Sequence, residues 1–327
     1  MKKISKIIFC VITLFVIIFT PLVAYKKTAN GQSFPKTTPS HKRILTLWNV
    51  DTFEGGVGSR GDFLSKVALS FKGDGSLVMV INHTVESAKT AFSSGQIPDM
   101  ISYGVGVDFV VGHAVELNKT DFSGGEYNGK FYAHAWCRGG YFLISKKPDN
   151  QPIERLIVSK NLYNLPYGAL NLSGISALGQ EFSEPIKAYL KYLDKGNNFL
   201  LGTQRDIWRL ERRGEEFYSK PLEKFSDLVQ YLSITTKDKD KLAECKKFLE
   251  YMTSDSVQEK ITQIGMFPIK FNPYTGKLGE YNLTKTEYTV SPFTKNERLI
   301  ELVEETSNEK ITNDSLLKFK NTLKRLK

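Results

Sequence analysis

The chain has 327 residues, of which 41% are apolar and 24% are charged, and its formal net charge is +10. This composition excludes a disordered polymer and is sufficient for one large core or two cores of ordinary size. The basic excess would suit nucleic acid, an anionic cell envelope or an acidic ligand. Because the lysines are scattered and no DNA- or RNA-binding motif accompanies them, we expect an envelope contact and no nucleic-acid partner.

The first part of the chain has the layout of an export signal. Basic residues flank an uncharged run from Ile7 to Ala24 on both sides. We therefore expect residues 1–24 to be either a cleaved signal peptide or an N-terminal membrane anchor, and the rest to work on the extracellular face of the cytoplasmic membrane. Cys10 follows Phe9 in the middle of the run, which does not fit a lipid-modified cysteine. Residues 25–41 are rich in Lys, Thr, Pro and Ser and predict a flexible spacer.

From Lys42 onward, strand and helix patterns alternate. The expected elements are strands at Ile44–Trp48, Leu77–Ile81 and Asp99–Tyr103 and helices at Phe63–Phe71 and Val85–Phe92. The second strand is an unbroken apolar run, as in a strand that is covered on both faces. The alternation predicts a parallel, doubly wound sheet whose ligands bind at the carboxyl ends of the strands.

The rest of the chain repeats these signals less regularly, and the stretch between Pro148 and Pro185 is rich in turns. The elements expected there are a tight turn at Asn128-Gly129, two strands within Lys130–Ser145, a helix at Pro185–Leu193, strands at Asn198–Gly202 and Leu228–Thr235, helices at Leu242–Met252 and from Ser254 to Gly265, and charged surface helices within 296–327.

Two patterns with a possible chemical role have simpler explanations. The glycines of Gly56–Gly61 fit the dinucleotide pattern GxGxxG, but no carboxylate follows the second strand to bind a ribose, and an exported protein rarely meets NAD. Cys137 and Cys245 are the only cysteines after the export segment, too few for a disulfide framework or a CxxC metal site. We expect two buried thiols or a single bridge between them.

Catalytic patterns are weak. The four histidines form no HExxH pair, and no GxSxG motif occurs, so metal and triad chemistry are unsupported. A secreted carbohydrate hydrolase that uses a pair of carboxylates remains an alternative. Asp51, Glu54 and Asp206 are the acids to examine for such a pair. The three tryptophans, Trp48, Trp136 and Trp208, stand beside charged or glycine-rich positions, as in surfaces that bind sugars through an aromatic face.

Four segments taken together carry a family resemblance. They are Thr46–Trp48 with the loop to Arg60, Gly95–Ile101, Tyr127–Lys130 before a strand, and Tyr231–Phe267 with its paired helices. In their order and spacing, which span most of the chain, the sequence resembles the extracellular solute-binding proteins of bacterial ABC transporters. The resemblance is to their sugar-binding branch, which has the type II periplasmic-binding fold.

The resemblance implies an α/β protein whose two hinge-linked lobes enclose a ligand in the cleft between them. It assigns residues 42–138 with 232–266 to the first lobe and residues 139–231 with 267–327 to the second. The chain would cross between the lobes near Trp136–Gly140, Tyr231–Ser233 and Gly265–Pro268. It further implies a monomer with no catalytic residue, cofactor or metal, which passes a polar ligand, a carbohydrate by preference, to an ABC permease.

The family pattern also implies the ligand-binding positions. They are Trp48, Asp51, Glu54, Ser59, Arg60, Tyr103, Trp136, Arg138, Arg205, Asp206 and Phe267. For Arg60, Arg205 and Asp206, an ion pair between the lobes or on the surface is an equal alternative. Phe267 would close over the ligand.

Two features depart from the family pattern. The chain is short between Pro148 and Pro185, where relatives carry much of the second lobe, and it lacks a lipid-modified cysteine. A protein tethered by an uncleaved helix would present its ligand to a membrane sensor rather than to a permease. An envelope-binding role that rests on positive charge is the remaining alternative.

Overall fold

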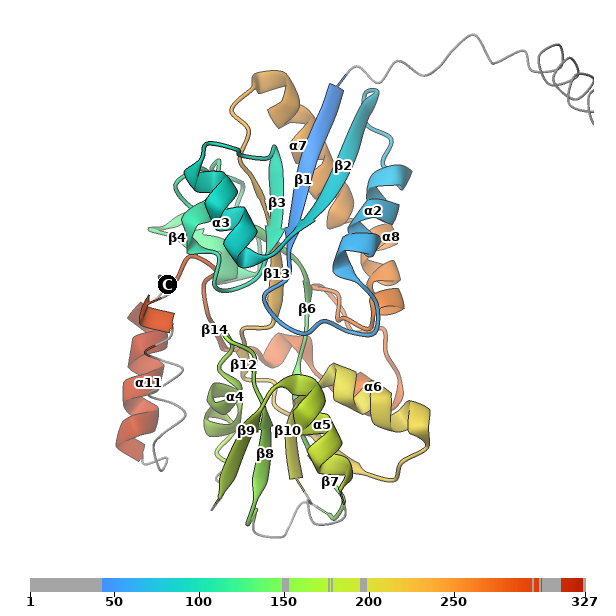
Figure 1. Ribbon diagram of the computed structural model, residues 1–327, viewed down its shortest axis with the longest axis vertical. Coiled ribbons are helices and arrows are strands. Elements are labelled where there is room, and N and C mark those ends of the chain that lie inside the picture. Colours follow the sequence, from blue (N-terminus) through green and yellow to red (C-terminus); the bar gives the residue numbers. More distant parts are fainter. Residues whose placement is uncertain are drawn as a thin grey trace, which may run out of the picture. The chain divides into compact units, whose positions relative to one another are not determined.

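The computed structural model describes residues 43–148, 153–175, 177, 179–194, 199–295, 297–299, 301 and 313–325 (Figure 1). The predicted export segment and spacer, residues 1–24 and 25–41, lie outside this part. None of the helices within the described ranges is both long enough and apolar enough to span a membrane.

The first sheet has the strand order β2-β1-β3-β13-β6. Its strands are β1 (Arg43–Val50), β2 (Ser76–His83), β3 (Met100–Tyr103), β6 (His134–Arg138) and β13 (Val229–Ile234). β1 pairs in parallel with β2 and β3, whereas β13 runs antiparallel to β3 and β6. The predicted parallel β-α-β unit is therefore confirmed.

Helices cover both faces of this sheet (Figure 1). They are α2 (Arg60–Ser70), α3 (Val85–Ser93), α7 (Lys239–Met252) and α8 (Asp255–Gln258), with a 3₁₀ extension at Glu259–Ile264. Because side chains alternate along a strand, Leu45 and Leu47 of β1 pack with α2, α7 and α8, while Trp48 and Val50 pack with α3. We call the sheet with these helices the first lobe.

The expectation that Leu77–Ile81 is covered on both faces is wrong. β2 lies at the edge of the sheet, where Met79 is 45% exposed and Ile81 is 36% exposed. An unbroken apolar run does not distinguish a central strand from an edge strand, because hydrogen-bonded neighbours leave no local pattern in the sequence.

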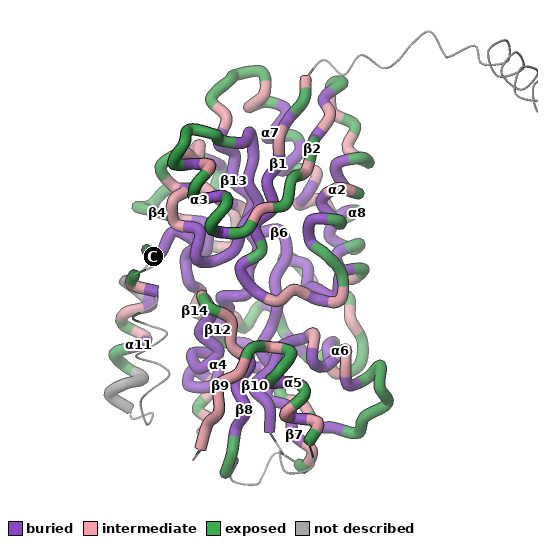
Figure 2. The backbone as a smooth tube through the Cα atoms, viewed as in Figure 1, coloured by how far each residue is buried: buried purple, intermediate pink, exposed green. Residues whose placement is uncertain are grey.

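The second sheet has the order β11-β7-β10-β8-β9. Its strands are β7 (Tyr141–Ser145), β8 (Leu156–Ser159), β9 (Gln180–Ser183), β10 (Phe199–Thr203) and β11 (Tyr218–Pro221). Its helices are α4 (Pro166–Leu172), α5 (Pro185–Leu193), α6 (Gln204–Arg213), α9 (Gly276–Gly279) and α11 (Asn313–Arg325). This sheet and its helices form the second lobe. Figure 2 shows that buried residues dominate the inner strands of both lobes.

The stretch between Pro148 and Pro185, expected to be rich in turns, contributes β8, α4 and β9 to the second lobe. The C-terminal tail, expected to form charged surface helices within 296–327, is also partly buried. Phe319 and Leu323 of α11 are buried in the core that α4 shares with Phe225.

The chain passes between the two sheets through short segments. Gly139 and Gly140 link β6 to β7, and residues 222–228 lead from β11 to β13 by way of β12 (Phe225–Ser226), which pairs with β14 (Tyr288–Thr289). Phe267 and Arg138 exchange two backbone hydrogen bonds of 2.8 and 2.9 Å. The boundaries of the lobes at 138, 231 and 266 stay a prediction.

Asn128-Gly129 forms the predicted tight turn, with φ values of 50° and 78° that only glycine and asparagine adopt readily. It joins β4 (Glu126–Tyr127) to β5 (Lys130–Phe131). Further 3₁₀ turns lie at Asp108–Val110, Ser123–Gly125 and Leu283–Lys285.

Candidate functional site

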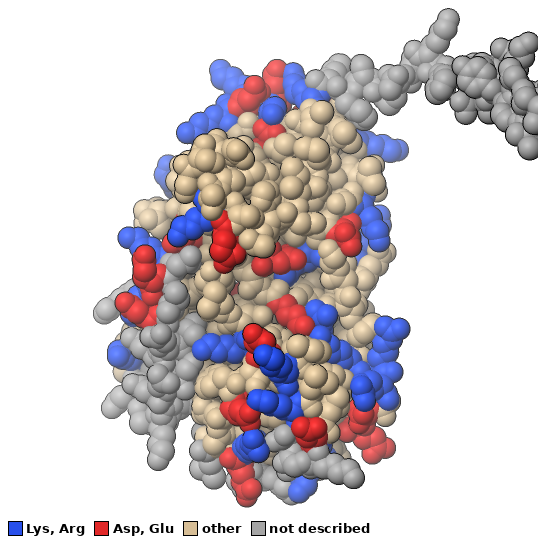
Figure 3. All heavy atoms as spheres, viewed as in Figure 1, with Lys and Arg blue, Asp and Glu red and all other residues tan. Residues whose placement is uncertain are grey.

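The candidate site lies where the two lobes meet. β1 and β3 of the first sheet and β8 of the second end in loops that face the other lobe, and β10 leads directly into α6. Ligands of such sheets bind beyond the carboxyl ends of the strands. Figure 3 shows acidic and basic side chains beside one another where the loop after β1 approaches α6. We call the contacts that these loops make with α6 and with one another across the lobes the edge contacts.

The glycine-rich part of the first loop has a packing role. A Cβ on Gly56 would lie 1.9 Å from the carbonyl oxygen of Ile264, and one on Gly58 would lie 2.9 Å from the Ile264 side chain. The Gly58 N–H also donates to the Ile264 carbonyl at 3.3 Å. Close approach to the end of the 3₁₀ segment therefore explains these glycines without a dinucleotide.

Arg60 and Asp51 form an ion pair inside this loop. The Arg60 Nε donates to Asp51 Oδ1 at 2.8 Å, and its Nη2 donates to the Phe53 carbonyl at 2.6 Å. The guanidinium lies 4.1 Å from the centre of the Phe53 ring and is 2% exposed, whereas Asp51 is 43% exposed. Arg60 Nη1 has no hydrogen-bond partner. A buried, unpaired N–H of this kind could bind an acceptor oxygen of a ligand.

Glu54 joins the same loop to α6 of the second lobe. Its Oε1 accepts from Arg209 Nη2 at 2.9 Å and lies 3.3 Å from Arg205 Nη1. Asp206, which lies between these arginines in sequence, accepts the Thr203 N–H at 2.9 Å and contacts Arg209 Nη1 at 3.2 Å. Burial raises the pKa of Asp206 to about 6, against the opposing effects of the Thr203 N–H and the Arg209 charge.

A second edge contact joins Gly106 to Tyr163. Gly106 follows β3 with φ 102°, and a Cβ there would lie 2.5 Å from the Tyr163 ring. Asp227 anchors the loop that carries Tyr163. Its carboxylate accepts from the Tyr141 hydroxyl at 2.8 Å and from the Leu165 N–H at 2.5 Å. Burial raises the pKa of Asp227 to about 6. The amide oxygen of Asn164 in this loop is buried and has no partner.

Several predicted ligand residues lie inside the lobes in this arrangement. Trp48, 7% exposed, packs against His83 and Phe92 with ring centres 4.1 and 5.8 Å away. Trp136 is fully buried, and its indole N–H donates to Ser102 at 3.1 Å. Neither tryptophan offers a free aromatic face at the edge.

Tyr103, Ser59, Arg138 and Phe267 also have structural partners. The Tyr103 hydroxyl lies 2.7 Å from the Ser233 hydroxyl, and burial raises the pKa of Tyr103. Ser59 caps α2 by accepting the Asp62 N–H at 3.1 Å. Arg138, 2% exposed, donates to the Leu283 carbonyl at 2.7 Å and to the Thr286 hydroxyl at 3.2 Å, and its burial lowers its pKa. The Phe267 ring stacks on Tyr281 at 4.9 Å.

The structure thus brings Asp51, Glu54, Arg60, Arg205 and Asp206 together at the edge. The roles of all the predicted positions in binding stay predictions.

Sequence reasoning missed Arg209 and Tyr163. Arg209 lies one helical turn beyond Arg205, so its spacing could have identified it. Tyr163 lies in a loop without periodicity, and no local signal marks it.

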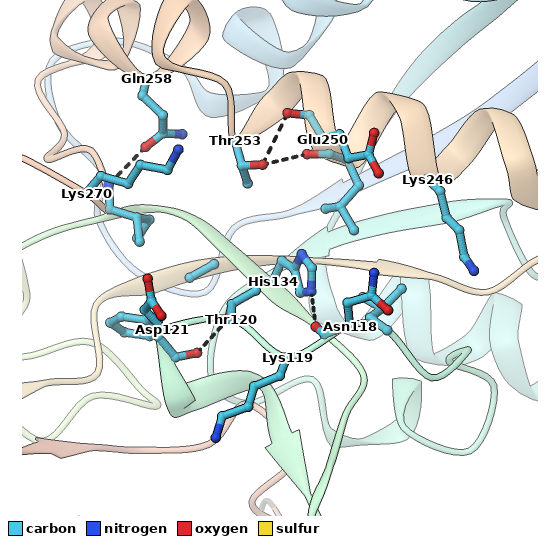
Figure 4. Close-up of a pocket in the computed structure, with 15 residues that line it drawn as sticks. Asn118, Lys119, Thr120, Asp121, His134, Lys246, Glu250, Thr253, Gln258 and Lys270 are labelled. Carbon is cyan, nitrogen blue, oxygen red and sulfur yellow. Dashed lines mark hydrogen bonds between the residues drawn. The ribbon is translucent and has the colours of Figure 1, made fainter.

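A separate pocket of about 350 Å³ lies beside the first sheet, away from the edge contacts. In Figure 4, Lys246 and Glu250 of α7 and Thr253, which follows this helix, approach it from one side, and Asn118, Asp121 and His134 from the other. Its apolar lining includes Leu117, Ala135, Leu249 and Ile269. It lies at the amino end of β6, whereas the passage to the second lobe lies at the carboxyl end of that strand.

The two cysteines after the export segment are thiols. Cys137 and Cys245 are both buried and free, so the alternative of a bridge between them is wrong. Among the described residues, no three His, Cys, Asp or Glu side chains lie close enough together to hold a metal ion.

No protein-family model and no curated protein matches the sequence. Solved structures do match the fold. A cyclic α-maltosyl-1,6-maltose binding protein from Arthrobacter globiformis has a TM-score of 0.57 at 11% identity, over 86% of this chain and 98% of that one. The GacH receptor of Streptomyces glaucescens, solved with acarbose, has a TM-score of 0.55 at 14% identity, over 87% and 98% of the two chains.

A Trichodesmium protein in complex with iron and citrate is as similar, with a TM-score of 0.57 at 11% identity over 81% of this chain and all of that one. At these identities the likeness concerns the fold, and the ligands named for the three proteins differ in kind. The predicted fold class is confirmed: the chain has the two-lobe α/β fold of the type II periplasmic solute-binding proteins.

Proposed function

We propose that the chain is a solute-binding protein that holds a small polar ligand between its lobes and delivers it to an ABC importer on the extracellular face of the cytoplasmic membrane. The observation that carries the proposal is the set of edge contacts, where mainly side chains join the two lobes. Such contacts can separate and re-form as a hinge opens and closes. The fold supports the same role, because its solved relatives are binding proteins.

We further propose carbohydrate as the ligand class. The Asp51 carboxylate, the Arg60 guanidinium and the Asn164 amide can bind sugar hydroxyls from both lobes, because each offers planar donors or acceptors. Since Trp48 and Trp136 are buried, the half-buried ring of Tyr163 is the aromatic face that we assign to the sugar.

The ligand leaves unchanged in this proposal. Glycoside hydrolysis requires two free carboxyl groups on either side of the bond. Here Asp51 is paired with Arg60, Glu54 with the arginines of α6, and Asp206 with the Thr203 N–H at the start of that helix. Asp51 and Asp206 are thus used inside their own lobes, and Glu54 joins the two lobes.

The test is thermal unfolding of the full-length chain, purified in a mild detergent, with neutral oligosaccharides, sugar acids, amino acids, polyamines and iron(III) citrate. A ligand at about 100 times its Kd stabilises the folded state by about 2.7 kcal/mol. In a chain of this size that raises the melting temperature by roughly 5 °C. We expect a saturable shift with a carbohydrate and no product by mass spectrometry.

Tyr163→Ala should weaken carbohydrate binding at least tenfold, while Tyr218→Ala, which removes a 51% exposed tyrosine from edge strand β11, should not. A shift only with iron(III) citrate or amino acids would overturn the carbohydrate class. Formation of a cleaved product would overturn the binding role itself.

A further inference from the structure

Two arginines of α6 converge on one carboxylate oxygen of the first lobe. Arg205 and Arg209 are four residues apart, so they project from the same side of the helix. Both reach Oε1 of Glu54, at 3.3 and 2.9 Å. All three side chains are largely shielded from solvent, with exposures of 30%, 16% and 18%.

The position of Arg209 is fixed by its own lobe. Its Nη1 contacts the fully buried Asp206, and its guanidinium lies 5.2 Å from the centre of the Tyr189 ring on α5. Asp206 is in turn held by the Thr203 N–H. Glu54 is therefore not needed to orient this guanidinium, and its Nη2 points toward the first lobe as a ready donor.

Glu54 uses only one of its two carboxylate oxygens in its contacts with the arginines. Its second oxygen, Oε2, is buried without a hydrogen-bond partner, as is Nη1 of Arg60 in the same loop. A carboxylate bound by arginine commonly uses both oxygens, so one that uses a single oxygen leaves a buried acceptor unsatisfied. Burial lowers the pKa of Arg205, the Glu54 charge opposes this shift, and the positive charges of Arg209 and Arg60 act with it.

We propose that Arg205 and Arg209 form the subsite for a carboxylate of the ligand, and that Glu54 occupies it as an internal substitute when no ligand is bound. The ligand is accordingly an acidic sugar, such as a uronic acid or an oligomer of one. This inference rests on the proposed function and narrows its ligand class. Glu54 precedes Gly55 in a loop outside any helix or strand, so rotation of its side chain suffices to vacate the subsite.

Calorimetric titration with matched pairs tests the proposal: galactose against galacturonate, glucose against glucuronate, and a neutral galactose disaccharide against digalacturonate. Glu54→Gln removes the competing charge and keeps the side-chain shape. We expect it to bind the acid of a pair at least tenfold more tightly than the unaltered protein does, with the neutral sugar unchanged. The gain should shrink as salt is added.

Arg205→Gln with Arg209→Gln should lose at least tenfold in affinity for the acid and little for the neutral sugar. The matched control is Glu181→Gln, because Glu181 also contacts two cations, Arg155 and Lys191, but lies on edge strand β9. It should change neither affinity. Melting curves of each variant would show that the fold is intact.

If Glu54→Gln changes the affinity for acid and neutral sugars equally, Glu54 only fastens the lobes together and the inference is overturned, while the proposed function stands. If every variant binds only the neutral sugars, the inference is likewise overturned and the proposed function stands. If neither member of any pair binds to any variant, both the inference and the carbohydrate class are overturned.

Discussion

The two lobes are joined in two regions that differ in construction. At the passages between the sheets, Arg138 and Phe267 exchange backbone hydrogen bonds, and both side chains are almost fully buried. At the edge, Glu54 meets its arginines through side chains that solvent still reaches, and Tyr163 only lies against Gly106. We call the first set the crossing contacts. The difference indicates that the crossing contacts hold the fold and that the edge contacts are free to respond to a ligand.

The largest effect is expected at the crossing contacts. Phe267→Ala removes a ring that is fully buried and stacked on Tyr281, and it should destabilise the protein by about 3 to 5 kcal/mol. Phe267→Leu, which keeps most of the volume, should cost less than about 1.5 kcal/mol. Denaturant unfolding measures both.

The same pair of variants tests the predicted role of Phe267 over the ligand. A packing role predicts that Phe267→Leu binds carbohydrate as the unaltered protein does. A large loss of carbohydrate affinity in Phe267→Leu, which stays folded, would indicate that Phe267 contacts the ligand directly. The crossing contacts would then take part in binding, as the edge contacts do.

Asp227 connects the two regions, because it lies in the passage before β13 and anchors the loop that carries Tyr163. Its pKa is raised from 3.8 to about 6, mainly by burial, so the folded state binds its proton more tightly than the unfolded state does. The stability from this group is fully present below pH 3.8 and is lost as the pH rises to about 6. The loss is on the order of 3 kcal/mol.

Asp227→Asn should therefore flatten the decline of unfolding free energy between about pH 4 and 6, measured by urea denaturation across that range. Asp206, also with a raised pKa, contributes a similar decline and will remain. The Asn variant still accepts from Tyr141 but no longer offers a second acceptor to Leu165. An unchanged pH profile would mean that Asp227 titrates near its ordinary pKa and is not buried as described.

The sequence predicted the first lobe better than the second for a physical reason. Helices of the first lobe such as α2 and α3 have buried residues at helical spacing with exposed residues between them, so their periodicity is visible. In the second lobe, β8 has four residues and α4 has seven, and every residue of both is buried. Short elements that are buried all round have no periodicity to detect.

The candidate site was predictable only in part. Glu54, Arg60, Arg205 and Asp206 were reached through the family pattern, because loops after strands are recurrent ligand positions. The burial of Trp48 and Trp136 could not be predicted, since aromatic residues near strand ends serve cores and pockets equally. The meeting of Gly106 with Tyr163 depends on how the lobes approach, which neither segment encodes locally.

The smallest effect on stability, and the sharpest test of the edge contacts, comes from two glycines. Gly95→Ala and Gly106→Ala both place a side chain at positive φ, 80° and 102°, and each should cost about 1 to 2 kcal/mol. Only the Gly106 methyl would meet Tyr163, at 2.5 Å, because no atom lies within 4 Å of a Cβ at Gly95. Small-angle X-ray scattering should therefore show a larger radius of gyration for Gly106→Ala alone, together with weaker ligand binding. If the two variants have the same radius of gyration, the Tyr163 loop moves aside without separating the lobes. The contact of Glu54 with its arginines then holds the lobes together.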